Sequence, residues 1–394
     1  MDSKVEKTSF LQYIGFGVLS LFFFMYTLGS LYGQGDDYLG IFYVAIAIAA
    51  VILIQDGRLL GQYRRYYIWQ GAFILFIIIS TAYTTDPNPS SYVWVMFKIL
   101  LKVTTVAIIC KNFEGVKKLM LCLAFVGLAV FITLYSRGLL AITERLGYDI
   151  MGNANSFGLM AAVFFTGAMS SFFETKTKVL KYLLLVAVLF DILLMILTGG
   201  RKFLLYSIVF VFSSLLVKGS VKPARLFLVT LVMGLIVYIG AYFIMHNEYL
   251  YDAIGYRFVG LSGGEAEGVD DQATLMKRGL EMFSEKPILG WGINSYMYSG
   301  GFSMYAHSNY VELLADLGIV GTLLYYSNYI WCLSVMWRSR RRRDEEFKLY
   351  FPLLISIIVI EIFSITFNQT AYIPLFIMLI SGYCFRLNSQ RYVK

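Results

Sequence analysis

The sequence predicts an all-α polytopic membrane protein with about 12 transmembrane helices and one long outer-face loop that contains short amphipathic helices. Of its 394 residues, 58% are hydrophobic and only 15% are charged, whereas soluble domains are nearer half apolar and a quarter charged. The apolar residues form stretches of about 20, the length that a helix needs to cross a bilayer. The net charge of +8 is spread over many short loops, which argues against nucleic-acid binding.

The expected spans follow one another within a single membrane domain over residues 1–394. They are residues 10–32, 38–54, 66–83, 92–110, 119–136, 154–173, 179–198, 203–217, 225–245, 318–337, 349–366 and 371–387. The first stretch is too long for the apolar part of a signal peptide and lacks a small-residue cleavage site. We therefore expect it to be retained as the first span.

Lysine and arginine indicate how these spans are oriented. With the N-terminus in the cytoplasm, the cytoplasmic segments hold most of the basic residues, loop after loop, as in other membrane proteins. The basic run at 338–343 fits a cytoplasmic anchor, and binding to anionic lipid is the alternative. Both termini are then cytoplasmic, and the long polar segment 246–317 lies on the outer face.

Nothing in the sequence predicts a metal, a cofactor or a nucleotide. The four cysteines fall in the cytoplasmic halves of their spans, where no disulfide is expected, and their spacing suits no metal site. There is no Walker loop for nucleotide phosphates. An outer-loop Asp-x-Asp, the usual sign of a metal-dependent glycosyltransferase, is also missing from the sequence.

Two outer-face arginines are candidate anion ligands. Arg201 follows Gly199 and Gly200 where two spans meet, and a guanidinium can bind phosphate through two parallel hydrogen bonds. An arginine that reaches the membrane interface is the alternative. Arg278 lies on an expected amphipathic helix, where an ion pair with Glu281 is the alternative.

His307 is the candidate proton acceptor. Ser308 and Asn309 resemble helix N-caps, and Glu312 resembles the carboxylate of a capping box. His307 is therefore expected just outside a helix that leads into the span after Gly318. A neutral imidazole can accept a proton near physiological pH, and a structural loop histidine is the alternative.

Lys98 and Lys102 lie four residues apart and hence on one face of the fourth span. Charges inside a membrane are expensive and point to function. Two explanations stay open, an ion pair such as Lys102 with Asp191, or a path for phosphate into the outer leaflet.

Four motifs occur in a fixed order along the chain. They are Asn155-Ser156-Phe157-Gly158, Gly199-Gly200-Arg201, the segment 278–292 that ends in Gly290-Trp291-Gly292, and the segment 307–321 that begins His307-Ser308-Asn309. Over about residues 150–330 the chain resembles the O-antigen ligase/polymerase (Wzy and WaaL) family of bacterial envelope enzymes. The resemblance implies transfer of an oligosaccharide from undecaprenyl diphosphate to an acceptor sugar hydroxyl, on the outer face of the bacterial inner membrane, without a metal or a nucleotide sugar.

The resemblance also implies roles for individual residues. Arg201 and Arg278 match the two arginines that engage the diphosphate, and His307 matches the histidine that acts on the acceptor hydroxyl. The family often has Ser-Arg-Gly where this chain has Gly200-Arg201-Lys202, which adds a second cation. Aromatic faces suit sugar rings and also the membrane interface. The expected substrate contacts are Lys98, Lys102, Lys202, Asn155, Trp291, Asn309 and Tyr310.

Within this family we expect a polymerase of O-antigen, capsule or exopolysaccharide repeat units, and a ligase that transfers glycan to lipid A core is the alternative. A lipid-linked oligosaccharide flippase is the alternative from another class, but it needs cations along a path through both leaflets, which Lys98 and Lys102 alone do not make. The expected partners are the undecaprenyl-diphosphate-linked donor and acceptor and the bilayer, and a chain-length regulator protein is a candidate.

The orientation predicts opposite labelling of two introduced cysteines. An impermeant thiol reagent added outside the cell should label a cysteine at Ser262 and spare one at Ser339. A cysteine-free parent is the control for background labelling. Outside labelling at both positions would contradict the twelve-span arrangement and the outer location of segment 246–317.

Overall fold

The computed structural model describes residues 9–29, 38–140, 145–151, 153–218, a few positions between 231 and 251, 269–367 and 372–390. Within these ranges the chain is helical and contains no β-strand, so the expected all-α class is confirmed. Six of the described helices are long and apolar enough to cross a membrane, or seven if one bent pair forms a single span. The expected span at 225–245 lies largely outside the described residues, and the count of 12 stays a prediction.

The chain separates into two compact units, each assembled from segments distant in the sequence. The first unit comprises residues 1–60, 105–207 and 247–254, and the second comprises residues 61–104, 208–246 and 255–394. The first contains α1 (Phe10–Thr27), α3 (Leu39–Gln55), α6 (Phe113–Ser136), α7 (Tyr148–Met151), α8 (Ala154–Glu174) and α9 (Lys178–Leu197). The second contains α4 (Arg64–Ser80), α14 (Val269–Glu285), α15 (Ser295–Ser299), α16 (Asn309–Ser339), α17 (Glu345–Ile360) and α18 (Tyr372–Ser389). Two helices, α5 (Ser90–Cys110) and α10 (Arg201–Lys218), have residues in both units.

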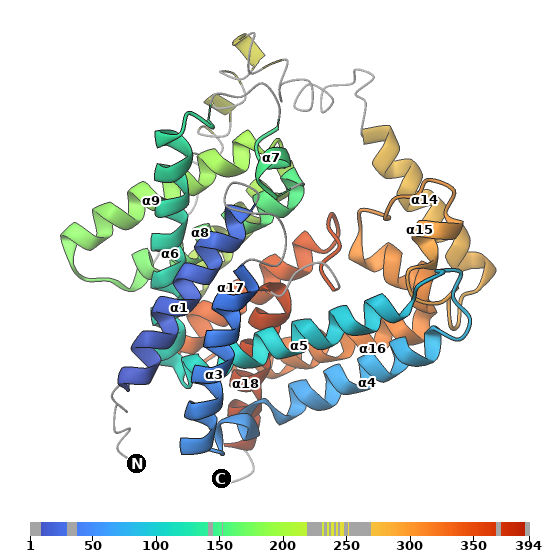
Figure 1. Ribbon diagram of the computed structural model, residues 1–394, viewed down its shortest axis with the longest axis horizontal. Helices are drawn as coiled ribbons and strands as arrows, with labels where there is room; N and C mark the ends of the chain where they lie inside the picture. The colour runs from blue at the N-terminus through green and yellow to red at the C-terminus, as the bar shows by residue number, and fades with distance from the viewer. Residues whose placement is uncertain are drawn as a thin grey trace. The chain divides into compact units, whose positions relative to one another are not determined.

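Glycines let α6, α8 and α9 of the first unit pack closely (Figure 1). A Cβ at Gly127 of α6 would lie 2.7 Å from side-chain atoms of both Phe164 and Asp191. A Cβ at Gly167 of α8 would lie 2.5 Å from the carbonyl oxygen of Met120. Small residues are what allow the backbones of membrane helices to approach one another, so these glycines fix where the three helices cross.

Polar side chains cap the beginnings of several helices. The Ser9 hydroxyl accepts the Gln12 N–H and the Gln12 side chain binds back to Ser9, which closes a capping box before α1. The Asn112 side chain accepts the Gly115 N–H at 3.0 Å, so α6 starts before the expected span. Such caps satisfy N–H groups that have no partner within the helix.

Helix α16 lies against α4 and α18 in the second unit (Figure 1). The Trp69 indole N–H of α4 reaches the carbonyl oxygens of Leu324 and Tyr325, at 2.8 and 3.0 Å. On another side, the Asn328 amide donates to the Ser381 hydroxyl at 2.7 Å. Buried polar contacts of this kind specify which helix faces meet.

Helices α16 and α17 also differ from the expected spans at one end each. Helix α16 begins at Asn309 and is broken at Gly318, whose φ of 62° and ψ of −168° are not helical, so the expected span 318–337 starts at this break. Helix α17 ends at Ile360 rather than near 366. The chain turns back there because the Asn309 side-chain oxygen accepts the N–H groups of Thr366 and Phe367, at 3.0 and 3.2 Å.

Candidate active site

A backbone clasp joins loop residues 287–292 to residues 315–320 around the break in α16. Its four hydrogen bonds, donor first, are Trp291 to Ala315 (3.0 Å), Gly292 to Asp316 (2.7 Å), Ile319 to Pro287 (2.9 Å) and Val320 to Ile288 (3.2 Å). Gly290 and Gly318 have φ values of 72° and 62°. A Cβ at Gly290 would lie 2.3 Å from the Asp316 carbonyl oxygen, and one at Gly318 would lie 2.4 Å from that of Ile288. The clasp therefore requires glycine at both positions.

A buried carboxylate secures the chain that follows the clasp. Asp316 is fully buried, and its two oxygens accept the N–H groups of Asn294 at 2.8 Å and Tyr296 at 2.7 Å. Asn294 has a φ of 61°. Its side chain donates to Asp86 at 2.9 Å and accepts from the Tyr92 hydroxyl at 2.7 Å. The turn into α15 is thus held by three side chains from two distant parts of the second unit.

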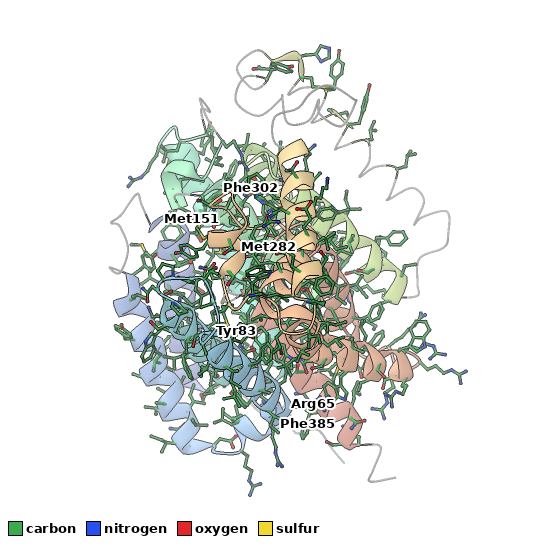
Figure 2. The ribbon with its side chains drawn as sticks, turned by 90° about the vertical axis from the view of Figure 1, so that its right-hand side faces the viewer. Arg65, Tyr83, Met151, Met282, Phe302 and Phe385 are labelled. Atoms are coloured by element: carbon green, nitrogen blue, oxygen red, sulfur yellow. The ribbon has the colours of Figure 1, made fainter. Side chains whose placement is uncertain are left out.

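Helix α14 packs onto the start of α16. A Cβ at Gly279 would lie 2.4 Å from Cγ1 of Val311, so the two backbones approach closely at this point. Met282, labelled in Figure 2, is fully buried in the same contact region. Arg278 precedes Gly279, and His307 lies four residues before Val311. The structure therefore places the helix that carries Arg278 against the one that follows His307.

The Arg278 side chain lies at the edge of this packing and is about a third exposed, at 32%. One guanidinium nitrogen lies 3.4 Å from a Glu281 oxygen and 3.6 Å from a Glu285 oxygen. The ion pair anticipated from the sequence is therefore present. Exposed ion pairs contribute only about 0–1 kcal/mol. A more highly charged anion can therefore replace Glu281 and Glu285 as the partner of Arg278 at little cost in stability.

His307 occupies a strained turn that is tied on its N-terminal side. Its φ of 58° is rare for a residue with a Cβ, and such strain is often found at functional sites. The ring is half-buried, and its centroid lies 4.4 Å from that of Tyr305. The preceding Ala306 N–H donates to the buried Glu312 carboxylate at 2.7 Å. These contacts hold the imidazole beside a second aromatic ring.

The expected capping box before α16 is not formed. The N-cap is Ser308, and its side chain makes no capping hydrogen bond. Glu312 reaches further back, to Ala306, because the strained turn brings that N–H over the first helical turn. The Asn309 N–H donates instead to the Glu361 carbonyl oxygen at 2.9 Å. Both flanks of the turn at His307 are therefore fixed by hydrogen bonds.

Two of the expected substrate contacts have structural partners. Asn309 is fully buried, and its amide donates to the Tyr326 hydroxyl at 3.0 Å while its oxygen accepts two backbone N–H groups. The Tyr310 hydroxyl donates to the Ile358 carbonyl oxygen at 3.1 Å, and its ring stacks on that of Tyr326 at 4.6 Å. These contacts favour a structural role for both residues over the expected contact with substrate.

Trp291 is also engaged within the second unit. Its indole N–H donates to the Met282 carbonyl oxygen at 3.0 Å, and the Lys286 ammonium lies 3.7 Å from the ring centroid. The cation occupies one aromatic face. In the neighbouring loop, Tyr83, labelled in Figure 2, donates to the Leu289 carbonyl oxygen at 3.2 Å. A sugar could stack only on the part of the Trp291 ring that Lys286 leaves uncovered.

In the first unit, two of the motifs meet at a turn that we call the cationic turn, residues 198–202 together with Arg145. Gly199 has a φ of 65°, and Arg201 and Lys202 begin α10 directly after Gly200. Gly158 of the other motif lies against this turn, because a Cβ there would be 2.3 Å from the Phe203 ring.

Arg145 is the cation of this turn that the sequence analysis did not identify. It is only 8% exposed. Its Nε donates to the Thr198 carbonyl oxygen at 2.8 Å, and its guanidinium also reaches the Asn155 side-chain oxygen at 3.4 Å. Lys202 lies just before the expected span at 203–217, and burial together with the charge of Arg145 lowers the pKa of Lys202 to about 8. Two cations are thus held close together in a poorly hydrated place.

The remaining candidates do not join these groups through described contacts. Lys98 is exposed and Lys102 half-buried on α5. Neither carboxylate oxygen of Asp191 has a hydrogen-bond partner within the described ranges. Lys102 belongs to the other unit, so the ion pair considered for these two residues stays a prediction. The described residues also contain no group of three or more His, Cys, Asp or Glu side chains arranged to hold a metal ion.

Sequence reasoning missed the residues that secure both regions. Asp86, Asn294 and Asp316 support the clasp, and Arg145 with Thr198 supports the cationic turn. The available signals were an aspartate two residues before Gly318 in an apolar stretch, and an arginine that the predicted orientation puts on the outer side, where arginine is disfavoured. Neither signal reveals its partner, because the partners lie 20 to more than 200 residues away.

This arrangement defines a multi-pass helical membrane protein with cationic and histidine-containing regions at helix ends. Residues 184–326 match the Wzy_C family model, described as O-antigen ligase. The match includes Arg201, Arg278 and His307, and it confirms the resemblance to the O-antigen ligase/polymerase family. It indicates glycosyl transfer of the O-antigen ligase or polymerase type and leaves these two activities unresolved. No curated protein matches the chain.

The clasp predicts different effects for two fully buried aspartates. Asp316→Asn removes one acceptor and points an amide N–H at a backbone N–H, so it should destabilise the protein by about 1–3 kcal/mol. Asp191→Asn loses no hydrogen bond to the described residues and should be close to neutral. Thermal unfolding of the two variants in the same detergent measures the difference, and equal midpoints would show that the Asp316 bonds do not stabilise the second unit.

Proposed function

We propose that this protein polymerises undecaprenyl-diphosphate-linked oligosaccharide repeat units on the outer face of the bacterial inner membrane, with both termini in the cytoplasm. The observation that carries the proposal is the O-antigen ligase match over 184–326, within which α14 with Arg278 packs against the helix that follows His307. The choice of polymerase over ligase rests on general similarity. Because the matching family is that of O-antigen ligase, the ligase is the second candidate.

The chemistry requires an anion site and a proton acceptor. The acceptor hydroxyl oxygen attacks the anomeric carbon of the donor sugar, and the bond from that carbon to the diphosphate oxygen breaks. The diphosphate leaves with the bonding electron pair, and His307 receives the hydroxyl proton. Arg201 and Arg278 stabilise the negative charge that develops on the leaving group. The activated donor supplies the driving force, so the proposal includes no nucleotide and no metal ion.

Lys202 is proposed to add a titratable charge to diphosphate binding. Its pKa of about 8 means that it is charged below this pH and neutral above it. If only the charged form contributes, donor affinity should fall about tenfold between about pH 7 and about pH 9. Lys202→Arg should remove this dependence, because arginine stays charged throughout the range. Arg145 is the charged neighbour that acts on Lys202.

The measurement is equilibrium donor binding across this pH range in nanodiscs of zwitterionic lipid. A wild-type affinity as flat as that of Lys202→Arg would exclude Lys202 from diphosphate binding. A decline of equal size in both proteins would assign the pH dependence to another group.

Purified protein incubated with lipid-linked repeat units tests the activity directly. A polymerase should produce a ladder of glycan lengths and release undecaprenyl diphosphate, with EDTA present throughout. A single transfer to lipid A core would identify a ligase. Movement of donor across vesicles without any product would identify a flippase, and either result would replace the polymerase proposal.

Two kinds of variant should fail in different ways. Arg278→Ala or Arg201→Ala should weaken both donor binding and turnover, and Arg→Lys should restore them only in part, because an ammonium lacks the bidentate fork. His307→Ala should leave donor binding near normal and lower turnover by roughly 10²–10⁴. His246→Ala is the matched control, since this exposed histidine contacts the Tyr242 carbonyl oxygen at 2.9 Å.

Donor affinity and single-turnover rate should be measured for each of these variants. A folded His307→Ala protein with the wild-type rate would show that His307 is not the base. Loss of turnover in His246→Ala to the same extent would show that the assay responds to histidine removal in general.

A further inference from the structure

The cationic turn contains a charged group for which the family resemblance provides no role. Arg145 comes from the segment before α7, outside both motifs that form the turn. Its Nε donates to the carbonyl oxygen of Thr198, the residue before Gly199. This contact brings a third cationic residue to the turn that leads into Arg201 and Lys202.

Two adjacent residues, Arg145 and Leu146, donate hydrogen bonds to backbone carbonyl oxygens at the end of α9. The Leu146 N–H donates to the Leu197 carbonyl oxygen at 3.1 Å, and Arg145 donates to that of Thr198 at 2.8 Å. The chain at 145–146 is therefore fastened to the C-terminal end of α9. The contact with Asn155 at 3.4 Å adds a link to α8. An arginine side chain that makes two hydrogen bonds, with its neighbour Leu146 also fastened to α9, has lost most of its rotamer freedom before any ligand binds, which favours binding.

The positive charges of Arg145 and Lys202 indicate which kind of ligand the cationic turn binds. Arg145 is 8% exposed, and its charge acts with burial to lower the pKa of Lys202. Like charges that repel in a poorly hydrated place destabilise the protein. An anion with more than one negative charge offsets that repulsion, and it gains charge-assisted hydrogen bonds from a guanidinium. Clusters of this kind are found more often at functional sites than elsewhere.

We propose that Arg145 binds the diphosphate of the lipid-linked donor directly, as the third cation of one site with Arg201 and Lys202. The inference rests on the proposed function for the identity of the donor, and the chemical class it requires is a lipid diphosphate. A monophosphate, with one phosphoryl group fewer, engages fewer of the three cations and binds more weakly. Asn155 orients the guanidinium through its side-chain oxygen.

The structural alternative is that Arg145 only caps the C-terminal end of α9, where a cation is favourable. A cap affects folding and leaves the affinity of the folded protein for anions unchanged. A binding residue affects that affinity in the folded protein. Affinity measured on folded protein therefore separates the two roles.

The test is binding of farnesyl diphosphate and farnesyl monophosphate to the full-length protein in phosphatidylcholine nanodiscs. Arg145→Gln should weaken diphosphate binding by about tenfold to a hundredfold, the effect of losing a hydrogen bond to a charged group. Arg145→Lys should give a smaller loss, and the preference for diphosphate over monophosphate should narrow in both variants. Arg137→Gln, at an exposed position near the end of α6, is the matched control and should bind as the wild type does.

Wild-type diphosphate affinity in Arg145→Gln, with or without a lower unfolding temperature, would overturn the inference and leave Arg145 as a helix cap. If the Gln variant does not fold, wild-type affinity in Arg145→Lys overturns it in the same way. A wild-type protein that transfers no glycan but binds diphosphate through Arg145 would refute the proposed function and support the site. Normal transfer together with normal diphosphate binding in Arg145→Gln would refute the site alone.

Discussion

The second unit depends on satisfying backbone hydrogen bonds where α16 is broken. At Gly318 the chain leaves helical geometry, and an unpaired backbone group in apolar surroundings costs several kcal/mol. The clasp between 287–292 and 315–320 supplies partners on both sides of the break. Close approach of the two segments leaves no space for a side chain at Gly290 or Gly318. The positions of α14 and of the turn at His307 follow from this requirement, because both adjoin the clasp.

The fold class could be predicted because membrane helices follow from composition and length, and most of the described helices begin and end within a few residues of their expected places. The breaks could not be predicted as readily. An apolar run around Gly318 is consistent with one straight helix, and only the partners at 287–292 explain why it bends. The early end of α17 likewise depends on Asn309, about 50 residues earlier in the chain. Long-range hydrogen bonds of this kind have no local signature in the sequence.

The sequence identified a candidate site residue where a motif places a basic side chain directly after glycines that mark a turn, as in Gly199-Gly200-Arg201. Charge alone was less informative, since Arg145 is one of several basic residues that the sequence predicts on the outer face. The structure distinguishes it through burial and through its bond to Thr198. Asn309 and Tyr310 present the opposite case. Their place in a motif predicts substrate contact, and their hydrogen bonds also join the start of α16 to α17 and to the turn that follows α17.

The two buried aspartates show that the number of hydrogen bonds a carboxyl accepts tells more about its structural role than its burial does. Asp191 and Asp316 are both fully buried in helices of largely apolar sequence, and each lies close to a glycine. Asp316 accepts two backbone N–H groups and fixes a turn. Asp191 accepts no hydrogen bond from the described residues, and its oxygen lies where a Cβ on Gly127 would be. A buried carboxyl without a hydrogen-bond donor gains nothing that offsets the cost of its burial. The same residue type therefore fixes a turn in one unit through its hydrogen bonds and fills space in the other.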